Sequence, residues 1–62
     1  MKSPIDKLRS YALRYHKAHF VDDGFLKWRM NSEQNICARV ATKAIELGLK
    51  VTYYNRNLIV HY

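Results

Sequence analysis

Apolar positions recur every three or four residues near the start of the chain, which predicts an amphipathic helix over residues 3–20. Ser3 occupies the N-cap position, Pro4 the first helical position and Asp6 the capping-box position, so the start of the helix is also signalled. The face that we expect to be buried carries Ile5, Leu8, Ala12, Tyr15 and His19. The remaining surface of the helix would carry the basic side chains of Lys7, Arg9, Arg14 and Lys17.

The pattern changes after residue 20. Residues 21–24, with the sequence VDDG, predict a turn, because Asp-Asp-Gly is turn chemistry and Gly24 tolerates a positive φ. Residues 25–30, FLKWRM, then fit a period of two, which favours a short strand. Its two sides would carry Phe25, Lys27 and Arg29 on one and Leu26, Trp28 and Met30 on the other. The second side is an ordinary core face, whereas the first combines an aromatic ring with two cations.

A second amphipathic helix is predicted over residues 31–48. Asn31 or Ser32 could cap its start, and Gly48 is suited to a left-handed C-cap at its end. Its apolar arc consists of Ile36, Cys37, Val40, Ala41, Ala44, Ile45 and Leu47. Such a wide arc with small alanines predicts close packing against a sheet or another helix. The exposed strip would consist of Asn35, Arg39, Lys43 and Glu46.

The last segment, residues 49–62, reads as a β-hairpin. Its turn falls at Asn55-Arg56 or at Arg56-Asn57, since Asn tolerates the left-handed conformations that tight hairpins require. Either position of the turn gives the same two sets of residues on the two faces of the hairpin. One face would carry Val51, Tyr53, Leu58, Val60 and Tyr62, and the other Lys50, Thr52, Tyr54, Ile59 and His61.

We therefore expect residues 1–62 to form one small α+β domain with the element order α-β-α-β-β. An isolated hairpin is marginal in water, so residues 25–30 should join it as the third strand of an antiparallel sheet. Two helices would then cover one face of a three-stranded sheet and leave the other face open. The alternative is a reduced winged helix-turn-helix, in which the hairpin is the wing and the usual three helices become two unless residues 25–30 form a helical turn.

The charge balance is strongly basic, because 11 Lys and Arg residues against 5 Asp and Glu residues give a net charge of +6. Most acids have structural positions in helix starts or turns, whereas most bases have none, which indicates a polyanionic partner.

Cys37 is the single cysteine, so we expect no disulfide within the chain, no metal site and no cofactor. No apolar run approaches the ~20 residues of a membrane span, and the charged N-terminus is unlike a signal peptide. These features favour a cytoplasmic protein without a membrane partner.

The open sheet face is the first candidate site. There Lys27, Arg29, Lys50 and Arg56 would contact phosphates, while Phe25 and Tyr54 would stack on unpaired bases. The sequence thus predicts a small non-catalytic protein that binds RNA or DNA, with single strands favoured over duplexes. In the winged geometry, Arg39 and Lys43 would instead enter a major groove, with Arg56 on the wing.

Two other classes of function stay open. Exposed Tyr, Trp and Arg side chains are also typical of interface hot spots, so the chain could be a regulator or inhibitor of a partner protein, as phages and mobile elements encode. A small ribonuclease toxin is the lesser alternative, with His16, His19 and His61 as candidate acids and bases, although no carboxylate is placed to orient them. An exposed strand edge also leaves a homodimer open.

Overall fold

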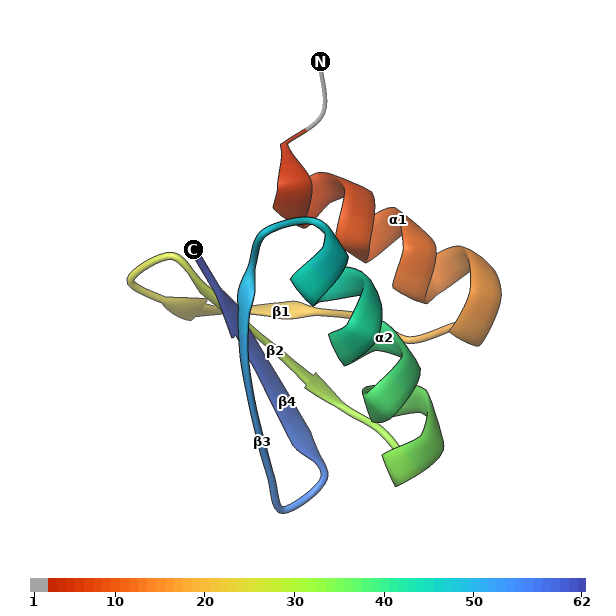
Figure 1. Cartoon of the computed structure of the whole chain (residues 1–62). Helices are drawn as coiled ribbons and strands as arrows, with labels where there is room; N and C mark the ends of the chain where they lie inside the picture. Colours follow the sequence, from red (N-terminus) through yellow and green to blue (C-terminus); the bar gives the residue numbers. More distant parts are fainter. Residues whose placement is uncertain (1–2) are drawn as a thin grey trace.

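In a computed structural model, which describes residues 3–62, the chain forms two helices and four strands. In chain order these are α1 (Pro4–His16), β1 (Val21–Gly24), β2 (Lys27–Asn31), α2 (Gln34–Glu46), β3 (Lys50–Tyr54) and β4 (Asn57–His61). The strands form one antiparallel sheet in the order β1-β2-β4-β3. Both helices lie against the same face of the sheet (Figure 1). The α+β class and the two helices on one sheet face are therefore confirmed.

The prediction of a three-stranded sheet is wrong, because residues 21–24 form β1 and the element order is α-β-β-α-β-β. Val21 pairs with Arg29 and Gly24 with Lys27, so β1 adds to the free edge of β2. The Asp and Gly residues that predicted a turn instead make an irregularity inside the strand. The Gly24 amide donates a 2.8 Å hydrogen bond to the Asp22 carboxylate, and the strand register shifts between these two residues. Hairpin pairing with β2 therefore overrides the local signal for a turn in residues 21–24.

The predicted strand at 25–30 begins two residues later than expected. Phe25 and Leu26 form the β1–β2 turn, with φ angles of 50° and 60°, and only the residues from Lys27 onward pair with β4. Leu26 is 65 % exposed and does not join the core, and Phe25 does not lie within the strand. Since these residues form a turn and a strand, they do not supply the third helix of a winged helix-turn-helix.

Helix α1 starts as predicted and ends earlier. The Asp6 amide donates to Ser3 Oγ at 3.3 Å, which confirms Ser3 as the N-cap. The Asp6 carboxylate accepts from the Ser3 hydroxyl at 3.0 Å, whereas a full capping box would have it accept from the Ser3 amide. The helix ends at His16 because Lys17 adopts a left-handed conformation, with a φ of 53°. Tyr15, which lies inside the helix, and His19, which follows it, are both exposed rather than buried. The buried residues that follow the helix are instead Ala18 and Phe20.

Helix α2 shows the opposite pattern, with a different start and the predicted end. Glu33 is the N-cap and its side chain makes no capping hydrogen bond, while Asn31 belongs to β2. At the other end Gly48 has a φ of 84°, and the Leu49 amide donates to the Ala44 carbonyl at 2.9 Å. This Schellman-type ending confirms the role expected for Gly48.

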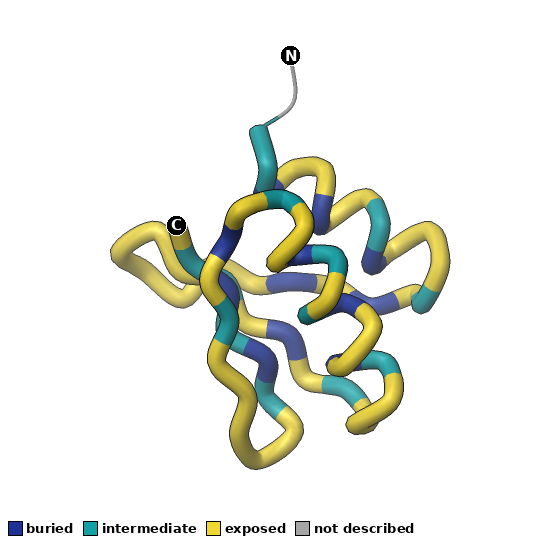
Figure 2. Tube along the Cα trace, viewed as in Figure 1, coloured by how far each residue is buried: buried dark blue, intermediate teal, exposed yellow. Residues whose placement is uncertain are grey.

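The core lies between the two helices and the sheet (Figure 2). Its fully buried large side chains are Leu8, Met30, Cys37, Val40, Leu58 and Val60. In β4 the burial alternates residue by residue, as expected for a strand with one covered face. Ile45 and Tyr53 were also expected in the core, but they are 62 % and 43 % exposed. Both belong to the α2–β3 side of the molecule, where the sheet ends at β3.

The C-terminal hairpin is confirmed, and its turn is Asn55-Arg56. The two residues have φ angles of 48° and 63°, and Tyr54 pairs with Asn57 to close the turn. No helix within residues 3–62 has the length and apolar character needed to cross a lipid bilayer.

Candidate nucleic-acid interface

The sheet face turned away from the helices is called the open sheet face here. Strand register arranges its side chains in three rows that run across the strands. The rows are Lys27–His61–Lys50, Val21–Arg29–Ile59–Thr52 and Asn31–Asn57–Tyr54. Of the residues in these described rows none is acidic, so the face carries positive charge without neighbouring carboxylates in register.

The first row has a lysine on each side of a histidine. Lys27 and Lys50 are both exposed, and the spacing of paired strands puts their Cα atoms about 10 Å apart. Half-buried His61 lies between them, with Nδ1 at 3.2 Å from the Tyr62 carbonyl oxygen. Because a carbonyl oxygen only accepts, this hydrogen bond needs the proton on Nδ1 and leaves Nε2 as the second polar atom of the ring. In the neutral ring Nε2 is then an acceptor, so the groups of this row that can bind an anion are the ammonium groups of Lys27 and Lys50.

The third row is built from side-chain amides. Asn31 Nδ2 donates to Asn57 Oδ1 at 3.1 Å, and Asn57 Nδ2 donates to the Asn55 carbonyl at 3.2 Å. These bonds hold two planar amides beside the exposed ring of Tyr54. Amides offer both donors and acceptors, which is the chemistry that reads the edges of unpaired bases.

An open hollow of about 560 Å³ continues the face beyond the start of β1. It is lined by His16, Lys17, Ala18, His19, Val21, Arg29, Asn31, Ser32 and Asn57. The early end of α1 brings Lys17 to the same hollow as Arg29, although the two residues lie on different elements. Within the described part of the chain, His16 Nε2 is buried and has no hydrogen-bond partner. The hollow therefore adds the cation of Lys17 to the open sheet face, whereas the buried His16 Nε2 is not accessible to a ligand.

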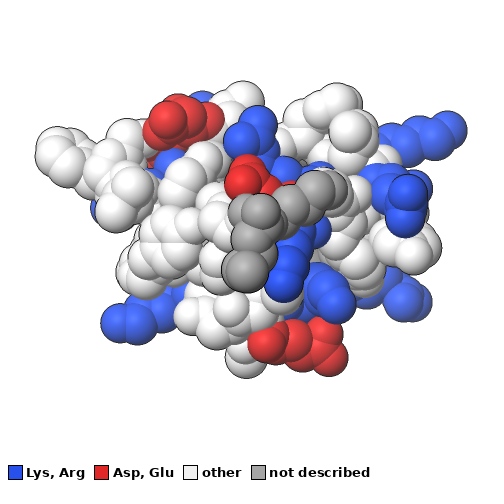
Figure 3. Space-filling view, turned by 90° about the horizontal axis from the view of Figure 1, so that it is seen from above, with Lys and Arg blue, Asp and Glu red and all other residues white. Residues whose placement is uncertain are grey.

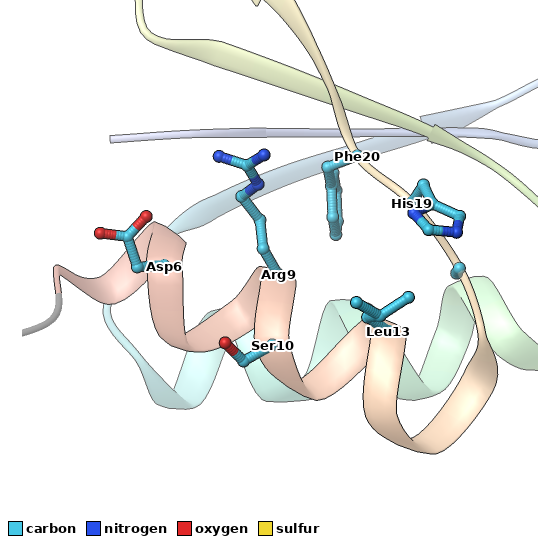
Figure 4. Close-up of a pocket in the computed structure, with 7 residues that line it drawn as sticks. Asp6, Arg9, Ser10, Leu13, His19 and Phe20 are labelled. Atoms are coloured by element: carbon cyan, nitrogen blue, oxygen red, sulfur yellow. The ribbon is translucent and has the colours of Figure 1, made fainter.

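A second hollow, of about 380 Å³, lies between α1 and the segment that leads into β1 (Figure 4). Figure 4 shows the side chains of Arg9 and Phe20 in the gap between α1 and the sheet, with Asp6 nearer the start of the helix. Since Asp6 takes part in the helix cap and the hollow has both charge signs, this surface lacks the uniform positive character of the open sheet face.

The eight residues predicted for the site separate into four locations. Lys27, Arg29, Lys50 and Tyr54 share the open sheet face. Arg56 lies in the β3–β4 turn, and Phe25, which is 97 % exposed, lies in the β1–β2 turn. Arg39 and Lys43 belong to α2, which packs on the other side of the sheet, so they do not share a surface with the first group.

Lys43 already has neighbours on the helix side. Its Nζ lies 3.9 Å from Glu46 Oε2 and 5.7 Å from the centre of the Tyr11 ring. Figure 3, a view from above, shows Lys and Arg atoms on several sides of the molecule. Positive charge alone therefore does not single out one surface, and the open sheet face is distinguished by its register and its lack of acidic residues.

The sequence did not place Lys17, Asn31 or Asn57 at the open sheet face; Lys17 was expected on the basic side of the first helix, where it could contact phosphates. Asn31 was assigned to a helix cap, although it continues the alternation of Lys27 and Arg29 and could have been found from that pattern. The position of Lys17 depends on where α1 ends, and the hydrogen bond between the two asparagines depends on strand register. No local signal reports either of these.

Comparisons with protein-family models, with curated proteins and with solved structures found no match to this chain.

Proposed function

We propose that this protein binds nucleic acid without acting on it chemically, through the open sheet face and the hollow that continues it. One observation carries the proposal: Lys27, Arg29 and Lys50 share a sheet face on which none of the described residues in register is acidic. A phosphate backbone would neutralise these cations and release its condensed counterions, which is the main source of affinity in such complexes.

Single-stranded RNA or DNA fits this surface better than a duplex. Strands spaced by about 4.8 Å put the outer two strands of this sheet about 14 Å apart. This width exceeds the major groove of about 12 Å, which admits a two-stranded ribbon or a helix. An open sheet can instead support unpaired bases, which would stack on Tyr54 and hydrogen-bond to the amides of Asn31 and Asn57.

A second candidate function, a regulator that binds a partner protein, is favoured by the β1–β2 turn. Phe25 and Leu26 are 97 % and 65 % exposed in this turn. Figure 1 draws the turn at the left end of the molecule, and the outermost atoms at that end of Figure 3 belong to residues other than Lys, Arg, Asp and Glu. An aromatic ring with so little contact to its own chain is a typical anchor for a partner's pocket.

Titration of fluorescently marked single-stranded RNA, single-stranded DNA and duplex DNA at several salt concentrations tests the proposal. We expect the tightest binding to single strands, an affinity that falls steeply with salt, and full recovery of intact RNA afterwards. A preference for the duplex would move the site to Arg39 and Lys43 of α2. Binding to none of the three at low salt would refute the proposal and favour a protein partner, and degradation of RNA that depends on His16 or His61 would indicate an enzyme.

A further inference from the structure

The two edges of the sheet are protected to different degrees. Edge strand β1 carries Asp22 and Asp23, and its register shift leaves Asp23 without a partner across the strand pair. Charges and bulges are the usual devices that stop an edge strand from pairing with another chain. Edge strand β3, with the sequence KVTYY, pairs in regular register along its whole length and has a single charge, Lys50. Its Val, Thr and Tyr residues are also strong strand formers. The β3 edge is therefore the unprotected one.

The hydrogen-bonding groups of this edge follow from the β3–β4 turn. Asn55-Arg56 is a two-residue turn, and such a turn is closed by a pair of residues that exchange both backbone hydrogen bonds, here Tyr54 and Asn57. Bonded and non-bonded pairs alternate along an antiparallel ladder, so Thr52 also directs its amide and carbonyl toward β4. Val51 and Tyr53 then direct theirs outward, away from the sheet. These groups can accept a further strand without loss of a bond inside the chain.

The helix side of the same edge is apolar and incompletely covered. Tyr53 is 43 % exposed, although its cross-strand partner Leu58 is fully buried. Ile45 of α2 is 62 % exposed. A hollow of about 180 Å³ lies beside Tyr53, and its lining includes Ala38 and Ala41 of α2. A strand added at β3 would thus bring side chains to an apolar surface as well as hydrogen bonds to the edge.

We propose that a second copy of this chain pairs with β3 in antiparallel fashion, with the two-fold axis at Thr52, to give a continuous eight-stranded sheet. In this register Val51 of each copy lies opposite Tyr53 of the other, and Thr52 lies opposite Thr52. A β-branched residue opposite an aromatic one and threonine opposite threonine are both favourable cross-strand pairs. The amide and carbonyl groups of Val51 in one copy then exchange hydrogen bonds with those of Tyr53 in the other. This is the bonding pattern that the β3–β4 turn requires, because the turn directs these groups away from β4.

Charge is compatible with the same register. Lys50 lies opposite Tyr54 of the second copy, where an ammonium group and an aromatic ring attract each other. The two Lys50 residues are separated by about 14 Å along the strands, which exceeds the Debye length of about 8 Å at physiological salt. An unrelated partner strand would need to match these positions separately, whereas a second copy does so by symmetry. A two-fold axis perpendicular to the sheet would also put both open sheet faces on the same side of the dimer.

Sedimentation equilibrium over a range of protein concentrations up to about 1 mM tests the proposal, independently of any nucleic acid. We expect the unmodified chain to move from the mass of one chain toward twice that mass. Thr52→Lys, an exchange of an exposed side chain on the open sheet face, would put two ammonium groups opposite each other at the two-fold axis and weaken association at least about tenfold. The matched control, Thr42→Lys on the exposed side of α2, should associate like the unmodified chain.

Amide hydrogen exchange gives a second readout in the unmodified chain. The amides of Val51 and Tyr53 should exchange rapidly in dilute solution and slowly at high concentration, whereas those of Thr52 and Tyr54 should be protected at both. A chain that stays monomeric throughout the range would overturn the proposal. So would a dimer that Thr52→Lys leaves intact, or one in which the amides of Val51 and Tyr53 exchange equally fast at every concentration.

Discussion

The salt dependence of binding tests which surface contacts phosphate. The open sheet face and its hollow would present four cations to the strand that we propose, namely Lys17, Lys27, Arg29 and Lys50. For a single strand, each phosphate contact lowers the slope of log affinity against log salt by about 0.7, so four contacts predict a slope of about −2.8. Between 50 and 200 mM salt the affinity should then fall about 50-fold. The double variant Lys27→Gln and Lys50→Gln should halve the slope to about −1.4, with a fall of about 7-fold over the same range.

The chain offers a matched control for this experiment. The double variant Arg39→Gln and Lys43→Gln removes the same charge from the exposed side of α2, away from the open sheet face. Fluorescence anisotropy with a short single-stranded RNA at four salt concentrations measures both slopes. We expect the control to keep the slope of the unmodified protein. If the two double variants change the slope equally, only net charge matters, and the reasoning from strand register is wrong.

Three further predictions concern stability. Phe25→Asn combined with Leu26→Gly should raise the melting temperature by about 4–8 °C, because two side chains held at positive φ are replaced by residues that tolerate it; an unchanged or lower melting temperature would show that the turn stores no strain. Leu58→Ala should remove about 2–5 kcal/mol from a core that supplies only about 3–5 kcal/mol, so circular dichroism should report a largely unfolded chain, and a cooperative native-like melt would contradict this. Burial raises the pKa of the Cys37 thiol, so the folded chain holds its proton at a pH where the unfolded chain has lost it. Above the ordinary thiol pKa, the free energy of urea unfolding should therefore fall more steeply with pH in the unmodified chain than in Cys37→Ala, whereas below it the two chains should change in parallel. An equal fall in both chains above that pH would contradict the raised thiol pKa.

The elements that could be predicted are those with local signals. Ser3 and Asp6 cap α1 through contacts three residues apart, and Gly48 ends α2 in the left-handed conformation that glycine favours. The Asn55-Arg56 turn likewise has a residue suited to positive φ. In each case the residues that determine the structure are close in sequence, so the pattern is sufficient.

Strand β1 and its turn could not be predicted in the same way. Residues 21–24 have turn composition, and their strand conformation comes from pairing with β2 across a turn made of Phe25 and Leu26. Neither residue is a usual choice for positive φ, so the local sequence gives no hint of this hairpin. The wrong position of Phe25 in the predicted site has the same cause.

The candidate site also has a part that the sequence predicts and a part that it does not. Lys27, Arg29, Lys50 and Tyr54 were assigned to one face by alternation alone, and the register does bring them together. The hollow beside Arg29 depends on the end of α1 and on the shortness of β1, both of which are tertiary properties.

Mapping of a bound strand by NMR tests the central claim most directly. In a titration of the isotope-enriched protein with a short single-stranded RNA, the account predicts that the largest shift changes occur at Lys27, Arg29, Asn31, Lys50 and His61. The resonances of Arg39 and Lys43 on α2 should barely move. Changes concentrated on α2, or spread evenly over the chain, would contradict the claim that the open sheet face is the binding surface.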